Sequence, residues 1–245
     1  MNESTSAPLP PSPQPPKKPQ APQVSFEALP QGLGFLQTFE ALLKRPGSTV
    51  RALEEEGPQR FLGKHSAAAL SCLLPFGLVL GAFSGGTQFW AAPLKIVVGL
   101  SLSALICLPS FYIFLCLAGV EVRFSTVAGL LVACITLTAL LLVGFAPLLW
   151  IFSTSTDSLP FIGFLIILVW IVSLLIAFKI PKLLLQWLQS PPAPHLSLWK
   201  VLFVFVTLQM STTLRPLVGR SEVFLTNEKK FFLVHWLEES SRPAK

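Results

Sequence analysis

The chain has 245 residues, of which 52% are hydrophobic and only 12% are charged, and its formal net charge is +6. Soluble domains carry about a quarter of their residues as charges, so this composition excludes an ordinary soluble globular protein. A nucleic-acid-binding protein is also excluded, because the Lys and Arg residues form no patch with interleaved aromatic residues. The sequence predicts an all-α, polytopic membrane helix bundle with about five transmembrane helices and short interfacial amphipathic helices.

Residues 1–31 are predicted to form a disordered, proline-rich tail. Prolines recur from Pro8 to Pro22, and they favour an extended backbone with few hydrogen-bond donors. The PxxP repeat from Pro16 to Pro19 is a candidate docking motif for an aromatic groove on a protein partner. A solvated tail explains the same prolines, since such repeats also arise from composition alone.

Residues 32–65 are predicted to form interfacial amphipathic helices. One apolar stripe has the periodicity of a helix face, and basic residues supply the cationic side of a helix at lipid headgroups. Pro46 interrupts the pattern, and Ser48 or Thr49 is expected to cap a second short helix. A helix packed on the membrane domain explains the stripe equally well, and the two interpretations are compatible. The stripe consists of Phe35, Leu36, Phe39, Leu42 and Leu43, and the basic residues are Lys44, Arg45 and Arg51.

A long apolar region, residues 66–219, is predicted to be the transmembrane bundle, and residues 220–245 are predicted to be a C-terminal amphipathic helix and tail. Few charged residues interrupt the bundle, and most of them lie where a helix would reach the membrane surface. The last apolar stretch is near the lower limit for crossing a bilayer core of about 30 Å. The five predicted spans are residues 66–86, 92–120, 124–152, 160–178 and 198–214.

The charges of the loops predict a cytoplasmic N-terminus, since basic residues precede the first span. The first four spans then agree with the positive-inside rule, with Arg123 and Lys182 inside. The fifth span disagrees with the rule, because it would place Arg215 and Lys229 outside. Five crossings are preferred, a re-entrant segment at residues 198–214 is the alternative, and the side of the C-terminus stays open.

Gly77, Gly81 and Gly85 lie on one face of the first predicted span, at the spacing of two overlapping GxxxG steps. Small residues at this spacing let a neighbouring backbone approach closely. We interpret this glycine face as a packing surface within the bundle, with contact to a protein partner as its second use.

Three polar residues of the bundle are candidates for a functional or a packing role: Lys95, Gln209 and Arg215. A cation in hydrocarbon is costly and is usually paired or functional. Lys95 lies within one turn of its predicted helix end, however, and is expected to snorkel to the surface. Gln209 is expected to form a hydrogen bond between helices. Arg215 is expected to bond the carbonyl groups left free before Pro216.

The sequence carries no catalytic, cofactor or metal motif. P-loop, GxSxG and HExxH patterns are missing, and the 3 histidines are far apart, so they give no metal site. The 4 cysteines lie in apolar segments without a CxxC pair, which is typical of packing residues. No carboxylate lies inside a predicted span, which disfavours the ion relays of coupled transporters. We therefore expect no enzymatic activity and no bound cofactor.

Several motifs resemble those of one family. The ending Gln209-Met-Ser-Thr-Thr-Leu-Arg215-Pro-Leu-Val-Gly219 and the dipeptide Ala146-Pro147 are similar to bacterial multi-pass proteins with a QM…LRPFxG C-terminal motif. The lead-in Leu43-Leu-Lys-Arg-Pro46 and the run Leu108-Pro109-Ser-Phe-Tyr112 resemble Yip1-like membrane domains. The chain thus resembles bacterial Yip1-like membrane proteins of unknown function. It departs from their pattern at Leu217, where Phe is usual.

The resemblance covers about residues 40–235. It implies five spans and a location in the bacterial inner (cell) membrane. Eukaryotic Yip1-type proteins are five-span membrane partners of trafficking GTPases, whereas the bacterial proteins have no established activity. The resemblance therefore implies an architecture and no mechanism.

The sequence as a whole predicts a non-enzymatic integral membrane protein that acts in interaction, assembly or membrane organisation. Its expected partners are membrane lipids and a protein bound through the proline-rich tail or the glycine face. The alternative is a small transporter or channel component for an anionic solute, with Lys95 and Arg215 facing the anion path. The scarcity of buried polar groups favours the first hypothesis.

Overall fold

The computed structural model describes residues 26–29, 34–55, 57–84, 86, 88–156, 158–188, 190 and 194–213. Every regular element in these ranges is an α-helix, which confirms the predicted all-α fold class. The C-terminal helix predicted within residues 220–245 lies outside the described residues. The helices are α1 (Phe35–Lys44), α2 (Pro46–Glu55), α3 (Pro58–Ser84), α4 (Gln88–Leu117), α5 (Phe124–Ser155), α6 (Leu159–Ala177), α7 (Lys179–Trp187) and α8 (His195–Thr213).

Four helical stretches are long and apolar enough to cross a membrane, and the chain is a helical polytopic membrane bundle. They are Pro58–Ala82 in α3, Phe89–Leu117 in α4, Phe124–Ser155 in α5 and Phe161–Trp187 across α6 and α7.

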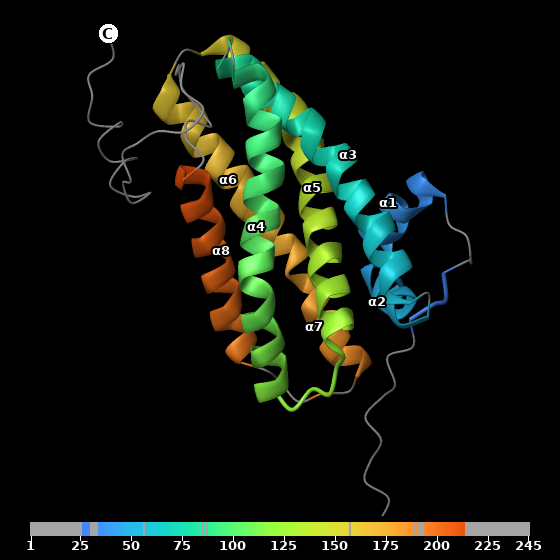
Figure 1. The fold of residues 1–245 in the computed structure, drawn as a ribbon. Helices are drawn as coiled ribbons and strands as arrows, with labels where there is room; N and C mark the ends of the chain where they lie inside the picture. The colour runs from blue at the N-terminus through green and yellow to red at the C-terminus, as the bar shows by residue number, and fades with distance from the viewer. Residues whose placement is uncertain are drawn as a thin grey trace, which may run out of the picture.

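The helix α8 contains a shorter apolar stretch, His195–Met210, and lies alongside α4 (Figure 1). It continues in one direction as far as Thr213, so no re-entrant turn occurs within the described part of this segment. The count of five crossings stays a prediction.

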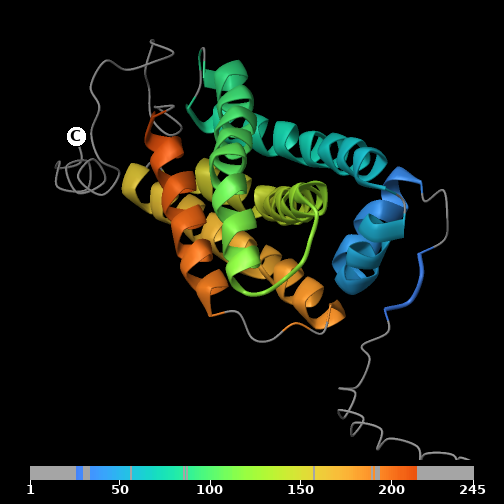
Figure 2. The ribbon, with the colours of Figure 1, turned by 60° about the horizontal axis from the view of Figure 1, so that its bottom comes forward.

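The helix α5 is at the centre of the bundle. It packs against α3 and α6, and it also contacts α1 and α2, while α4 packs against α3 and α8 (Figures 1 and 2). In the most apolar part of each helix, 61% of the residues of α5 are buried, compared with 33% in α4. The outer face of α4 is therefore largely available to lipid.

The region around the start of α5 collects the short surface helices, and we name it the basal end. In Figure 1 the α4–α5 turn, α7 and the start of α8 lie at the bottom, and α1 and α2 lie at the right, from middle to lower height. The basal end consists of α1, α2, the first turns of α3, the α4–α5 turn, α7 and the start of α8. Figure 2 brings this end forward and shows α2 and α7 near the end of α5, in agreement with their contacts. The opposite end carries the α3–α4 turn at Gly86 and the α5–α6 turn at Thr156 and Ser158.

The first long helix begins earlier than hydropathy predicts. It starts at Pro58 instead of residue 66, so its first turns occupy part of the interfacial region predicted over residues 32–65. Arg60 and Lys64 lower the hydropathy there, but Arg and Lys are good helix formers and do not end a helix. Proline is tolerated in the first turn, where the backbone N–H has no helical partner.

The second short helix also begins earlier than predicted. It starts at Pro46, so the expected N-cap at Ser48 or Thr49 is wrong. Both side chains are buried within the first turns of α2.

The helix α4 ends where Gly119 adopts a φ angle of +72°. This left-handed conformation favours glycine and is typical of a helix C-terminus. The N–H of Val120 donates a hydrogen bond to the carbonyl of Leu115 (3.1 Å), which satisfies one of the last carbonyls of α4. The chain then turns through residues 118–123 into α5.

Buried aromatic rings attach α8 to the bundle. Trp199 stacks on Phe111 of α4 with ring centroids 4.0 Å apart, and its Nε1 donates a hydrogen bond to the carbonyl of Cys107 (3.3 Å). Phe178, between α6 and α7, and Phe203 of α8 pack on the same indole and on each other. These four rings, named here the aromatic cluster, bring the start of α8 next to the start of α7.

Candidate functional site

Positive charge gathers at the basal end. Of the Lys and Arg residues that the structure describes, all except Lys95 lie on the elements of this end. Charged side chains at one end of a membrane bundle can reach lipid headgroups or water, while the rest of the bundle stays in the hydrocarbon core. These basic residues are Lys44, Arg45, Arg51, Arg60, Lys64, Arg123, Lys179, Lys182 and Lys200.

Three of these cations form ion pairs within the described residues. The pairs are Lys44–Glu40 at 2.9 Å, Arg45–Glu27 at 2.6 Å and Arg51–Glu55 at 2.6 Å. The hydrogen bond from Lys44 holds the pKa of Glu40 below its usual range. The remaining six basal cations have no ion pair with a described carboxylate.

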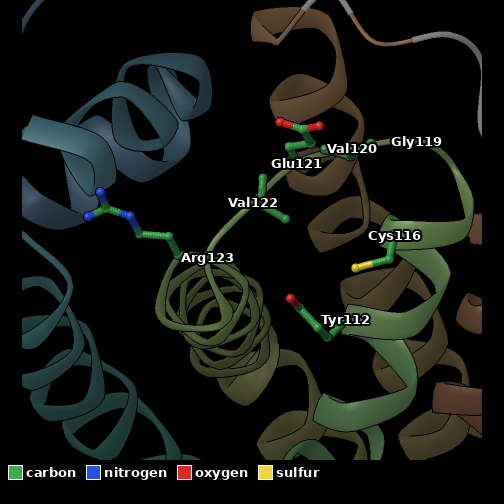
Figure 3. A pocket seen from close by; sticks show the side chains of 7 residues that line it. All are labelled: Tyr112, Cys116, Gly119, Val120, Glu121, Val122 and Arg123. Atoms are coloured by element: carbon green, nitrogen blue, oxygen red, sulfur yellow. The ribbon is translucent and has the colours of Figure 1, made fainter.

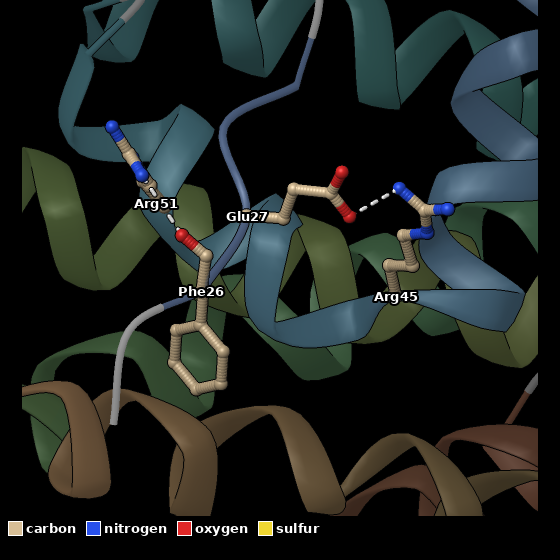
Figure 4. A network of polar contacts seen from close by, with 4 residues as sticks. All are labelled: Phe26, Glu27, Arg45 and Arg51. Carbon is tan, nitrogen blue, oxygen red and sulfur yellow. Dashed lines mark hydrogen bonds and ion pairs between the residues drawn. The ribbon is translucent and has the colours of Figure 1, made fainter. Parts of the chain in front are cut away.

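A four-residue segment, Phe26–Leu29, lies across the basal end (Figure 4). The ring of Phe26 stacks on Trp187 of α7 at 5.5 Å, and its carbonyl accepts a hydrogen bond from Arg51 of α2 (2.8 Å). The ring also lies against Gly47, where an added Cβ would overlap it. This N-terminal segment therefore connects α2 to α7, and the prediction of a disordered tail over residues 1–31 is wrong for these four residues.

Phe26→Ala is expected to loosen the N-terminal segment. An aromatic pair contributes about 0.5–1.5 kcal/mol beyond its buried area, so backbone hydrogen exchange at residues 26–29 should accelerate by up to about tenfold. The matched control is Leu36→Ala, because Leu36 is 79% exposed on the outside of α1. Equal exchange in the two variants, measured by mass spectrometry, would show that the Phe26–Trp187 contact does not hold the segment.

An open hollow of about 590 Å³ lies at the α4–α5 turn (Figure 3). In Figure 3 the side chains of Tyr112 and Cys116 point into it from successive turns of α4, whereas those of Glu121 and Arg123 point in different directions. The residues that line it are Tyr112, Cys116, Gly119, Val120, Glu121, Val122 and Arg123.

The hollow at the α4–α5 turn offers little chemistry. Catalysis by a thiol needs an adjacent base that removes its proton, and the residues that line the hollow include no His or Lys. Its position at the end of two spans places it at the level of lipid headgroups. Sequence reasoning missed it as a site, and the only signal was the charged turn of Glu121 and Arg123.

Three hydroxyl groups buried in the spans bond to backbone carbonyls, while those of Ser173 and Thr207 are buried without a hydrogen-bond partner among the described residues. Ser103 donates to Gly99 (2.8 Å) and Thr138 to Cys134 (2.9 Å), each within its own helix. Thr136 of α5 also reaches α3, where it donates to the carbonyl of His65 (2.9 Å). These bonds satisfy polar groups and join helices; they do not line a polar path through the described part of the bundle.

Two of the three predicted polar candidates, Lys95 and Gln209, lie on α4 and α8, which pack against each other. Lys95 is only 2% exposed, so its side chain is covered by protein and the expectation that it snorkels is wrong. Gln209 is half-buried on α8, and both residues interact with other groups of the chain. Arg215 lies outside the described residues.

The first residue of the glycine face, Gly77, makes a packing contact within the chain. Gly77 is buried against Pro93 of α4, and a Cβ added to it would overlap the Cα of that proline. Gly81 is also buried, and Gly85 lies outside the described residues. At Gly77, close approach of a neighbouring backbone joins α3 to α4.

The described residues contain no group of three His, Cys, Asp or Glu side chains that could hold a metal ion. Cys72, Cys107 and Cys134 are buried, while Cys116 is exposed at the hollow. His65 is buried, stacks on Phe61 at 3.8 Å and donates from Nδ1 to the carbonyl of the same residue. His65 and the three buried cysteines thus pack within the bundle.

Comparison with protein-family models, with curated proteins and with solved structures finds no match to this chain. The resemblance to Yip1-like proteins stays a prediction from its motifs, and much of the most specific motif, after Thr213, lies outside the described residues. The function is therefore argued from the geometry of the basal end and of the spans.

Proposed function

We propose that this chain is a non-enzymatic integral membrane protein that organises an assembly at the membrane through its basal end. The observation that carries the proposal is the gathering of all described cations but Lys95 on the surface helices and turns of one end. The spans themselves are apolar, and the buried hydroxyls of Ser103, Thr136 and Thr138 bond to backbone carbonyls. Such a molecule presents a positively charged surface at the basal end of a set of transmembrane helices that are solvated by lipid.

The basal end faces the cytoplasm in this proposal, and the N-terminus lies on the same side. Loops and helix ends that carry an excess of Lys and Arg remain on the cytoplasmic side of a membrane. The six basal cations without an ion pair to a described carboxylate strengthen this argument, because they add to the excess of positive charge at this end. The resemblance to bacterial Yip1-like proteins supports a location in the bacterial inner membrane.

The protein partner is proposed to bind the proline-rich tail where the tail meets the N-terminal segment. Phe26–Leu29 lies beside α2 and α7, and residues 1–25 directly precede it in the sequence. The glycine face is a weaker candidate for partner contact, because Pro93 covers Gly77. Membrane lipids cover the exposed apolar faces of the spans.

Site-specific photo-crosslinking in cells tests this proposal. A photoreactive residue in place of Leu36, which is 79% exposed at the basal end, is expected to form a protein adduct that disappears when residues 1–25 are deleted. The same residue in place of Leu105, which is 64% exposed on α4, is expected to label lipid only. Protein adducts from position 105 alone would refute the basal end as the interaction surface.

A transporter or channel component for an anionic solute is the second candidate, and the burial of Lys95 in a span favours it. Buried cations in membrane helices often mark ion pathways. Reconstituted vesicles distinguish the two candidates: a transporter should show an anion flux that Lys95→Ala abolishes while the protein stays folded. An organising protein should show the flux of empty vesicles in both forms.

A further inference from the structure

The ring of Phe26 occupies a position on α2 that has no side chain of its own. It stacks on Trp187 of α7 with ring centroids 5.5 Å apart, and it lies directly on Gly47 of α2. A Cβ added at Gly47 would overlap this ring, and the three heavy atoms nearest to that Cβ all belong to Phe26. The glycine therefore admits an aromatic ring between α2 and α7.

Two arginines bind the chain beside this ring. Arg51 lies one turn after Gly47 on α2 and donates a hydrogen bond to the carbonyl of Phe26 (2.8 Å). Arg45, between α1 and α2, pairs with the carboxylate of Glu27 at 2.6 Å. In Figure 4 the two arginines approach from different directions, so the carbonyl and the carboxylate have separate partners. The four residues that hold the segment, named here the docking surface, are Arg45, Gly47, Arg51 and Trp187.

Side chains of the docking surface, and not a backbone ladder, hold the N-terminal segment. Within the described residues, no backbone N–H or carbonyl of Phe26–Leu29 bonds to the backbone of a helix. Two of its four side chains are exposed and the other two are half-buried. The exposed side-chain fractions of Arg45 and Arg51 are 58% and 31%. Segments with few buried contacts open at a low cost in free energy, so this segment can leave while the helices stay folded.

We propose that the docking surface binds a peptide of a protein partner in which an aromatic residue is followed directly by an acidic residue. The chain's own Phe26–Leu29 occupies the surface when that peptide is absent. The proposal rests on the proposed function, because it specifies how a partner engages the basal end. Charge supports this class of peptide, since an acidic side chain pairs with Arg45 whereas a basic one is repelled by both arginines. One chain fills the surface by itself, so a second copy is not needed to cover it.

A fluorescent peptide that copies residues 24–31 tests the docking surface on the purified full chain in detergent. Phe26→Ala removes the ring from the surface, so this variant should bind the peptide, as measured by fluorescence anisotropy. The unchanged chain should bind it about tenfold more weakly, because its linked segment competes at an effective concentration of about 1 mM. A peptide with Ala in place of its Phe should bind neither form.

The double variant F26A/G47A is the matched control for the position of the ring. Once the ring of Phe26 is absent, the new Cβ meets none of the three atoms that obstruct it. Alanine also favours a helix more than glycine does, so α2 should stay folded. The Cβ should nevertheless exclude the ring of the peptide and weaken its binding at least about tenfold, the loss expected for overpacking.

The variant F26A/R45Q tests recognition of the acidic residue. It should bind the peptide up to about fivefold more weakly than F26A does, which is the range for an exposed ion pair. A peptide with Gln in place of its Glu should show the same loss with F26A. That peptide should show no further loss with F26A/R45Q, because the pair has already been removed.

Three results would overturn the proposal. If the peptide does not bind F26A, the segment makes an internal packing contact only. Equal binding by F26A and F26A/G47A would show that the peptide adheres elsewhere. A change from dimer to monomer in F26A, measured by analytical ultracentrifugation, would assign the surface to the segment of a second copy. If F26A does not fold, the unchanged chain decides, because excess peptide should displace the segment and accelerate hydrogen exchange at residues 26–29.

These measurements need no cellular partner, so their failure is distinct from failure of the photo-crosslinking experiment. Protein adducts at position 36 without peptide binding would place the partner elsewhere on the basal end and refute the docking surface. Peptide binding without protein adducts would contradict the proposed function and support the docking surface.

Discussion

Trp199→Ala is expected to detach α8 from the bundle. The indole is completely buried, stacks on Phe111 at 4.0 Å and donates its N–H to the carbonyl of Cys107. Removing a buried aromatic side chain costs about 3–5 kcal/mol in a protein core. The cost here should lie at the lower end of that range, because lipid, unlike water, solvates the exposed rings. The free energy of unfolding in a denaturing-detergent titration measures the effect.

Trp150→Ala is the matched control for this prediction. Trp150 is 48% exposed on α5, so its loss should change the free energy of unfolding by less than about 1 kcal/mol. In Trp199→Ala, protease cleavage after Lys200 should also accelerate, since this half-buried residue is protected by the same packing. Equal destabilisation by the two substitutions would show that the aromatic cluster does not attach α8.

The fold class and the four long apolar helices follow from hydropathy alone. Each helix of a bundle solvated by lipid needs an unbroken apolar stretch, and hydropathy detects such stretches directly from the sequence. Helix ends are less well encoded. The predicted start of α3 was too late in the chain, because Arg60 and Lys64 lower the hydropathy of its first turns. These charged residues do not break a helix.

The misplaced start of α4 explains the failure at Lys95. With a predicted start at residue 92, this lysine lies within one turn of the helix end and can snorkel. The helix begins at Gln88, which places Lys95 about two turns inside at 3.6 residues per turn. A shift of one helical turn in the boundary thus changes the expected environment of a charged side chain from surface to interior.

The basal end could not be assembled from the sequence, because its contacts join residues far apart in the chain. Phe26 lies in a proline-rich region whose composition favours disorder, yet its ring packs on Gly47 and Trp187 and the segment also bonds to Arg51 and Arg45. The start of α8 meets the α6–α7 junction because Phe178 and Trp199 pack together. Periodicity shows which face of a helix is apolar, but it does not show which helix covers that face.

Gly77→Ala is expected to separate α3 from α4. An added Cβ would lie 2.9 Å from the Cβ and the N of Pro93 and closer still to its Cα. Proline is a rigid ring with a fixed φ angle, so the obstructing atoms cannot rotate away and the helices must move. Overpacking of this kind costs about 1–3 kcal/mol, and the same denaturing-detergent titration measures the loss.

Gly144→Ala separates this steric effect from the general effect of placing alanine in a helix. Gly144 of α5 has open space where the Cβ would stand, with no heavy atom of the described chain within 4 Å. Alanine is the better helix former by about 1 kcal/mol, so this variant should be unchanged or more stable. If Gly77→Ala lowers the free energy of unfolding and Gly144→Ala raises it, the loss arises at the Gly77–Pro93 contact. A stabilising effect of both would mean that α3 and α4 do not approach each other closely enough to require glycine.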